Sequence, residues 1–230
     1  TTKSDDCVAT AATPTTPGEA IRRSAVRIPG FGDSDVFYPL VLLGRWNTTR
    51  EETLFLSSST TTTTTTPAAA TTTTTSTTTY PIRFIQSIQD DAVVMDRGFS
   101  QASLEKAVHP DRPVRSYQWT ETNPNDLRLQ FQDGGLIDSK VTKRATQRTE
   151  ETVESSEFQR ITIQQPDDPV PVLAAQRVLS KWKIVNNTNV EAIQVVYDMP
   201  SLGDPLGMDP GSMTAGPKMV AKVKLHLQRL

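Results

Sequence analysis

Residues that could bind a metal ion or act as a nucleophile are few and far apart in this sequence. Cys7, His109 and His226 are the only cysteine and the only histidines among 230 residues. A zinc site usually takes about four Cys, His or acidic ligands at short spacings, so the sequence predicts no zinc site and no bound cofactor. A single cysteine also excludes an internal disulfide.

Acid–base and acyl-transfer chemistry have no stronger candidates. The pairs Asp90-Asp91 and Asp167-Asp168 lie among turn-forming residues, where a solvated turn is preferred over a pair of catalytic carboxylates. Ser100 lacks the Gly-x-Ser-x-Gly context of a nucleophile elbow. We therefore expect no catalytic residue, and we predict that the protein is not an enzyme.

Charge and hydropathy narrow the classes of partner. The 24 basic and 26 acidic residues give a net charge of -2, which provides no field that would attract nucleic acid. No apolar run approaches the roughly 20 residues that a membrane-spanning helix needs, so we expect at most a peripheral attachment to membranes. The chain begins at Thr1, which is typical of a mature form without its targeting segment or of a truncated sequence.

Short segments of alternating polarity predict an all-β domain over residues 36–230. A chain of this length with 36% apolar residues can bury one sizeable core. We expect strands at 37–56, 80–88, 92–97, 114–120, 127–132, 136–146, 155–164, 172–185, 190–197 and 219–227, and a short helix at 101–108 that Ser100 caps. Hairpin connections favour a single antiparallel up-and-down barrel, with a two-sheet sandwich as the alternative.

The last predicted strand has the clearest alternation. One face carries Met219, Ala221, Val223, Leu225 and Leu227, and the other carries Val220, Lys222, Lys224 and His226. A period of two with one apolar face is typical of a strand in a sheet that has one side in water. We expect this strand to close the sheet.

Three segments do not fit the strand pattern. They are an extended N-terminal arm at 1–35, a Thr-rich insertion at 57–79 and a long loop at 200–217, and their composition favours solvated chain or contacts with a partner. The candidate partner contacts in the arm and the loop are Ile21, Arg22, Arg23, Pro29, Phe31, Met208 and Met213.

Gly44-Arg45-Trp46 stands at the start of the first long predicted strand. A Gly-x-Trp at this place resembles the calycin and lipocalin superfamily. The resemblance implies that Trp46 plugs the closed end of a barrel and packs on a basic side chain from near the last strand, for which Lys224 and Arg229 are the candidates. It also suggests a ligand cup.

Four aromatic residues are candidates for that cup or for the core. Packing in the barrel core is the preferred interpretation of Trp46, Trp119 and Trp182. The alternative places Tyr117, Trp119 and Trp182, with Trp46 nearby, around a small apolar ligand at the mouth of the barrel.

A wider resemblance covers residues from 28 to about 197. The segments that carry it are Ile28-Pro29-Gly30-Phe31, Phe37-Tyr38-Pro39, Val94-Met95-Asp96-Arg97-Gly98-Phe99, Asn123-Pro124-Asn125, Lys140-Val141-Thr142-Lys143-Arg144 and Ser155-Ser156-Glu157-Phe158. They resemble a family of plastid proteins of algae and plants with cyanobacterial relatives. This implies a nucleus-encoded chloroplast protein attached to thylakoids, without an established catalytic activity.

Two functional hypotheses follow from these patterns. Long arms around a small β-domain resemble the accessory subunits of algal photosystem and antenna supercomplexes, which implies photosystem core and antenna proteins as partners. We expect such a structural subunit first. The alternative is a lipocalin-like carrier or chaperone of a pigment, lipid or quinone.

Overall fold

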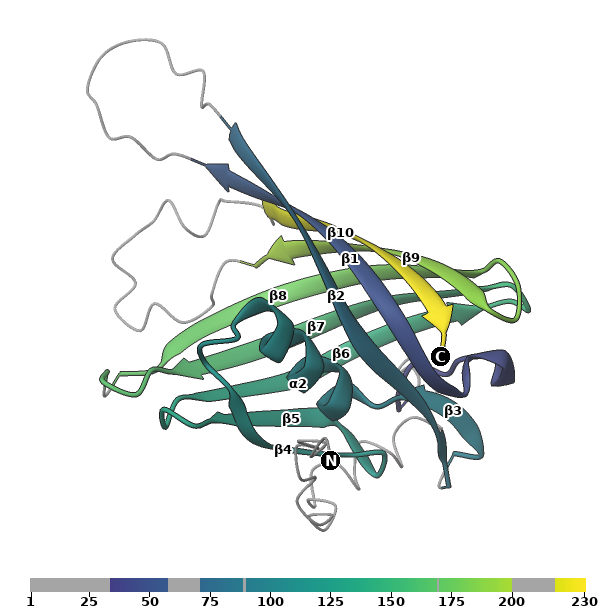
Figure 1. Cartoon of the computed structure of the whole chain (residues 1–230), viewed down its shortest axis with the longest axis horizontal. Coiled ribbons are helices and arrows are strands. Elements are labelled where there is room, and N and C mark those ends of the chain that lie inside the picture. The colour runs from purple at the N-terminus through teal and green to yellow at the C-terminus, as the bar shows by residue number, and fades with distance from the viewer. Residues whose placement is uncertain (1–33, 58–70, 89, 169, 200–217) are drawn as a thin grey trace, which may run out of the picture.

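The computed structural model describes residues 34–57, 71–88, 90–168, 170–199 and 218–230. Ten strands of this part form one antiparallel sheet that curls around a central space (Figure 1). The strands are β1 (Gly44–Ser57), β2 (Thr71–Ser87), β3 (Ala92–Met95), β4 (Val114–Thr120), β5 (Asn123–Phe131), β6 (Leu136–Arg148), β7 (Thr152–Gln164), β8 (Val172–Ile184), β9 (Asn189–Asp198) and β10 (Lys218–Arg229). The helical elements are the 3₁₀ helix η1 (Leu40–Leu42) and the helix α2 (Arg97–Val108). The prediction of an all-β, antiparallel fold is confirmed.

The strands follow a meander. Their order is β3-β2-β1-β10-β9-β8-β7-β6-β5-β4, so β10 returns to pair with β1. In that pair Trp46 lies opposite Arg229 and Leu54 opposite Ala221. The buried residues of β10 alternate with exposed lysines as its sequence predicts. The first and last strands of the described chain are therefore neighbours in the sheet.

The sheet itself is not closed. Within the described residues β3 and β4 stand at its two edges, and α2 packs against β2 on one side and against β4 and β5 on the other. Figure 1 shows the helix across this opening. The expectation that the barrel removes its edge strands by closing is wrong, because β3 is only four residues long and the chain enters a helix before it can pair with β4.

The helix begins earlier than predicted. Asp96, not Ser100, is its N-cap, since the Asp96 carboxylate accepts a hydrogen bond from the backbone nitrogen of Phe99 at 2.9 Å. Asp96 also forms an ion pair with Arg83 of β2. The start of α2 at Arg97 is thereby tied to the wall of the barrel.

The end of the Thr-rich segment is a strand. Residues 71–79 belong to β2 and pair with β1 from Thr49 to Ser57, so the prediction of an insertion loop over 57–79 is wrong for this part. The register that is set where Gly44 faces Phe84 continues along the whole pair, and β-branched Thr suits an extended backbone. Residues 58–70 lie outside the described part.

Two groups of apolar side chains form the core. The larger lies at the closed end, where the rings of Tyr38, Phe84 and Trp182 meet edge to face with centroids 4.9–6.0 Å apart. The smaller lies between α2 and strands β4 and β5; its buried members are Ala102, Val114, Tyr117, Leu129 and Phe131. The helix therefore seals the side of the barrel by apolar packing.

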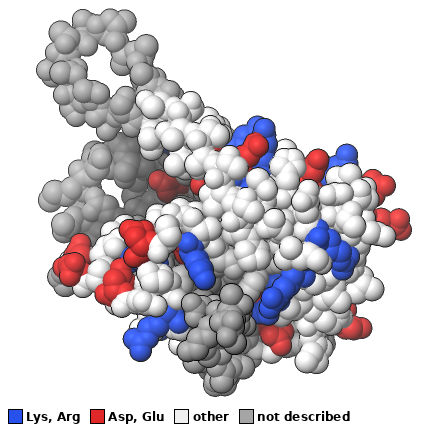
Figure 2. Space-filling view, in the orientation of Figure 1, with Lys and Arg blue, Asp and Glu red and all other residues white. Residues whose placement is uncertain are grey.

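The distribution of surface charge and the lengths of the helices can be compared with what the composition predicts. On the face shown in Figure 2, basic and acidic side chains are interspersed and neither sign forms a continuous patch. In the described part of the chain, no helix is both long enough and apolar enough to cross a bilayer.

Candidate ligand-binding site in the barrel interior

The closed end of the barrel is built around Trp46. Its side chain is fully buried and its Nε1 donates a hydrogen bond to the carbonyl oxygen of Leu42 in η1 at 2.7 Å. The Arg229 guanidinium lies 5.3 Å from the Trp46 ring, measured from Cζ to the ring centroid. Nη2 of Arg229 also donates to the carbonyl of Leu43 at 2.7 Å. A tryptophan, a short helix and an arginine therefore plug this end together.

The two other residues of the Gly44-Arg45-Trp46 motif have distinct places. Gly44 has a φ of 116°, a conformation that favours glycine, and it connects η1 to β1. Arg45 stacks its guanidinium over the Phe99 ring of α2 at 5.6 Å. Of the two candidate partners for Trp46, the structure selects Arg229, because the Lys224 side chain is 55% exposed and faces Glu51 at 3.7 Å.

Above this plug lies a cavity of about 460 Å³, bounded by the inner face of the sheet and by α2. Its lower wall is apolar and includes Ile82, Trp182 and Leu225. Polar side chains from β7, β8 and β9 line the wall beyond; they are Ser155, Gln159, Gln176, Ser180 and Gln194. The cavity therefore offers apolar surface at one level and hydrogen-bonding groups at another.

A buried network of four charged side chains stands beside the cavity. Arg97 at the start of α2 donates from Nη2 to Glu157 at 2.6 Å and to Asp35 at 3.1 Å. Arg144 donates from Nε to the same Glu157 at 2.6 Å and lies 3.4 Å from Asp35. The Arg144 side chain is 1% exposed and Asp35 is 3% exposed. Each charge therefore has an opposite charge as its neighbour, as burial requires.

Burial and pairing act in opposite directions on these groups. Burial raises the pKa of Glu157, but the guanidinium groups of Arg97 and Arg144 outweigh it and hold the pKa at about 2. For Asp35 burial prevails over the same two arginines and raises the pKa. Burial lowers the pKa of Arg97, and Glu157 and Asp35 reverse this, so that its pKa is raised. Burial also raises the pKa of Tyr38.

Sequence reasoning missed this network. Arg144 lies in a basic run and Glu157 ends an acidic one, and such runs usually form solvated faces, whereas Asp35 ends the predicted arm. A β-bulge between Val141 and Lys143 shifts the alternation of β6, which turns Arg144 to the interior. The one available signal was that Glu157 shares a face of β7 with Val153, which alternation places inside.

Ser34 and Asp35 belong to the domain. Both are buried, and the Ser34 carbonyl accepts hydrogen bonds from Arg144 and, at 3.4 Å, from Asn125. The predicted boundary between arm and domain at residue 35 is therefore too late by at least two residues. A family model described as Domain of unknown function (DUF6816) matches residues 30–230. The chain belongs to this family. It has no match among curated proteins.

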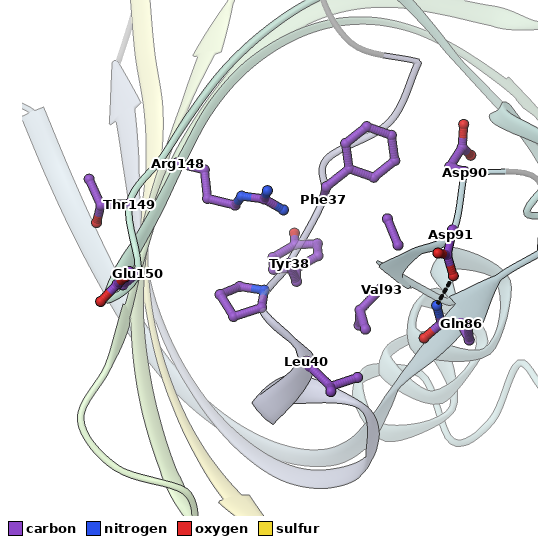
Figure 3. Close-up of a pocket in the computed structure, with 12 residues that line it drawn as sticks. Phe37, Tyr38, Leu40, Gln86, Asp90, Asp91, Val93, Arg148, Thr149 and Glu150 are labelled. Atoms are coloured by element: carbon purple, nitrogen blue, oxygen red, sulfur yellow. Dashed lines mark hydrogen bonds between the residues drawn. The ribbon is translucent and has the colours of Figure 1, made fainter.

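The DUF6816 domain has a second, open hollow of about 860 Å³ beneath the closed end. Figure 3 shows Phe37 and Tyr38 in its middle, with Arg148 on one side and Asp91 on the other. Asp91 accepts a hydrogen bond from Gln86 at 3.2 Å. Leu40, which lines the hollow, is 70% exposed. The hollow combines exposed apolar surface with charges of both signs.

The predicted cup residues separate in the DUF6816 fold. Trp182 lines the cavity, with its ring in the apolar wall. Tyr117 packs against α2, where a Cβ at Gly98 would clash with its ring, and Trp119 joins the same group with its Nε1 3.3 Å from the Pro124 carbonyl. Neither is among the described residues that line the cavity.

The remaining predictions concern partners and metals. The candidate partner contacts Ile21, Arg22, Arg23, Pro29, Phe31, Met208 and Met213 lie outside the described residues. Among the residues that are described, no group of three or more His, Cys, Asp or Glu side chains is arranged to hold a metal ion.

Proposed function

We propose that this DUF6816 domain binds a small amphipathic molecule inside its barrel, as a non-catalytic carrier or chaperone of the lipocalin type. The observation that carries the proposal is the interior cavity of about 460 Å³, with an apolar lower wall and a polar band. Its volume falls within the roughly 300–1,000 Å³ of small-molecule sites. An apolar wall with a few polar groups that fix orientation is the usual composition of such sites.

The architecture supports a preformed site. One end is plugged by Trp46, η1 and Arg229, which removes that route for water and leaves the cavity with a floor. The side opening is covered by α2, whose Gln101 and Leu104 also line the cavity. A molecule in the cavity therefore contacts the sheet and the helix together.

The test is a titration of the purified protein with N-phenyl-1-naphthylamine, a neutral probe that fluoresces in apolar sites. We expect saturable binding and quenching of tryptophan fluorescence, because Trp182 lies in the cavity wall. Ser180→Trp fills the cavity and should reduce probe affinity by about tenfold or more. Lys181→Trp, one residue along β8 on the outer face, is the matched control and should bind as the wild type does.

Two outcomes would contradict the carrier proposal. One is a wild-type protein that is folded by circular dichroism and does not bind the probe. The other is equal binding by the wild type and Ser180→Trp, which would place the probe somewhere other than the cavity. Extraction of purified protein with organic solvent, followed by mass spectrometry, would then identify any molecule that the native protein retains.

A second candidate is an accessory subunit of a photosystem–antenna supercomplex at the chloroplast thylakoid. The resemblance to plastid proteins supports it, and so does the open hollow at the closed end. Leu40, which lines the hollow, is 70% exposed, and Ile88, which follows β2 and is not part of that lining, is 89% exposed. Exposed apolar side chains around a hollow are typical of surfaces that contact other proteins. The partners would be core and antenna subunits.

The subunit hypothesis is tested by gentle solubilisation of thylakoids and separation of the complexes on a native gradient. Comigration of the chain with a photosystem band after a high-salt wash would support it, and loss of comigration in a Leu40→Asp, Ile88→Asp variant would locate the contact. Migration of the wild type near its own mass of 25.3 kDa would contradict it. The control is Glu121→Ala, in the turn between β4 and β5, where the side chain is half-buried.

A further inference from the structure

The polar band of the cavity consists of uncharged side chains, with the ion-paired Glu157 of β7 between Ser155 and Gln159. Gln159 on β7 lies opposite Gln176 on β8, and Ser180 on β8 lies opposite Gln194 on β9. Directly opposed residues of neighbouring strands have Cβ atoms about 5 Å apart. Gln176 and Ser180 share a face of β8 with Val178 between them, so the two pairs lie on the same wall, about 13 Å apart along the strand. Amides and hydroxyls therefore lie on both sides of an apolar residue of this wall.

These amides retain hydrogen-bonding capacity. Gln159 donates from Nε2 to Glu157 and Gln194 donates from Nε2 to Ser180, each at 3.4 Å, the long limit of a hydrogen bond. The Gln176 amide makes no side-chain hydrogen bond within the described residues. A carboxamide has two donor hydrogens and an acceptor oxygen, so the band can still bind an oxygen-containing head group.

The charged groups beside the polar band already neutralise one another, and Glu105, which lines the cavity from α2, accepts a hydrogen bond from Gln101 at 2.9 Å. Arg50 on the opposite wall donates to Glu52 at 2.6 Å, and Arg97 is held between Glu157 and Asp35. An ionised head group at the polar band would therefore lose its hydration without gaining a free counter-charge. An uncharged head has no such cost.

We infer that the ligand is an uncharged amphiphile whose carbonyl or hydroxyl oxygens bind the amides of Gln159, Gln176 and Gln194, and whose apolar body packs on Ile82, Trp182 and Leu225. The inference rests on the proposed carrier function and names the ligand class of the same cavity. An alcohol or a quinone with an aliphatic tail meets these requirements, and a fatty-acid anion or an alkylammonium ion does not.

The test compares four compounds that share one tail: decanol, decylbenzoquinone, decanoate and decylammonium. Each displaces N-phenyl-1-naphthylamine from the wild-type protein at pH 7. We expect decanol and decylbenzoquinone to bind at least about tenfold more tightly than both ions, since an uncompensated charge costs more than one factor of ten. Equal displacement by all four would overturn the inference and leave the carrier function intact.

A pair of variants tests the residues. Gln176→Leu combined with Gln194→Leu should weaken decanol and decylbenzoquinone by about tenfold relative to the naphthylamine probe, which corresponds to the loss of one or two net hydrogen bonds. Gln228→Leu, on exposed β10 surface, is the control and should change neither. Unchanged decanol affinity in the double variant would overturn the assignment to these amides, and failure of the wild type to bind any probe would overturn the carrier function as well.

Discussion

The closed end of the barrel and the side opening next to α2 are held together in different ways. At the closed end β1 pairs continuously with β2 and β10, and Trp46 fills the space with help from Arg229. At the side opening, within the described residues, β3 and β4 do not pair. There the helix is held by apolar packing on one face and by Arg97 in the buried ion network.

The comparison shows that apolar side chains stabilise one region of the sheet and charged side chains the other. Where backbone pairing continues, apolar burial supplies stability that depends little on pH. Where pairing stops, hydrogen bonds between strands are replaced by a helix whose first turn depends on charged partners. Local unfolding should therefore begin at α2, because in the part of the chain that the structure describes the helix makes no backbone-to-backbone hydrogen bonds to the neighbouring strands that would hold it in place. The following predictions test this contrast, from the largest effect to the smallest.

Trp46→Ala should destabilise the protein most. The side chain is fully buried, so its truncation leaves a cavity, and it also removes the hydrogen bond to Leu42. We expect the free energy of unfolding to fall by about 4 kcal/mol, within the range for large aromatic truncations in cores. Urea denaturation measures this. A loss below about 1 kcal/mol would mean that the closed end is not a packed plug.

Glu157→Gln should weaken the side opening rather than the closed end. The substitution leaves Arg97 and Arg144 buried with one negative partner fewer, and we expect a loss of about 3 kcal/mol. Hydrogen exchange should accelerate in α2 before it does in β1 and β10. The control is Glu154→Gln on the same strand as Glu157; it removes an exposed pair with Lys181 of β8 and should cost less than about 1 kcal/mol. Equal protection of α2 and β1 in Glu157→Gln would contradict the contrast.

Acid should act through the same group. The folded pKa of Glu157 is about 2, below its ordinary value of 4.5, so the stability it contributes is fully present above pH 4.5 and is lost as the pH falls towards 2. Asp35 has a raised pKa, so its protonation opposes this loss in part. Denaturation curves between pH 6 and pH 2 should show a steeper decline for the wild type than for Glu157→Gln. Parallel declines would exclude Glu157 as the responsible group.

Sequence reasoning was most successful where alternation is regular. The faces of β10 are predicted correctly from Ala221 onward, since Ala221, Val223, Leu225 and Leu227 are buried and the lysines between them are exposed. Met219, predicted on the same apolar face, is exposed and lies beyond a register shift. What the sequence could not decide was the choice between Lys224 and Arg229, because that depends on which residue of β10 lies opposite Trp46.

Irregular strands account for the errors in the site. Register shifts in β4 between Val114 and Ser116 and between Gln118 and Thr120 accompany the packing of Tyr117 on α2, away from the cup for which its aromatic ring made it a candidate. The bulge in β6 turns Arg144 inward in the same manner. A bulge leaves no clear mark in a single sequence, so residues beyond it are assigned to the wrong face. The polar cavity wall on β7, β8 and β9 was missed because Gln and Ser at alternate positions also suit a solvated face.

The smallest predicted change in stability distinguishes Arg229 from Lys224, the two basic residues of β10 that were candidates for packing on Trp46. Arg229→Met retains much of the aliphatic length and removes the guanidinium, which stacks on Trp46 and donates to the carbonyls of Val41 and Leu43. We expect a loss of about 1–2 kcal/mol from these interactions together. Lys224→Met should change stability by less than about 0.5 kcal/mol, because its pair with Glu51 at 3.7 Å is solvent-exposed. A red shift of tryptophan emission in Arg229→Met alone would show that water has reached the Trp46 ring, whereas equal effects of the two substitutions would mean that Arg229 does not hold the plug.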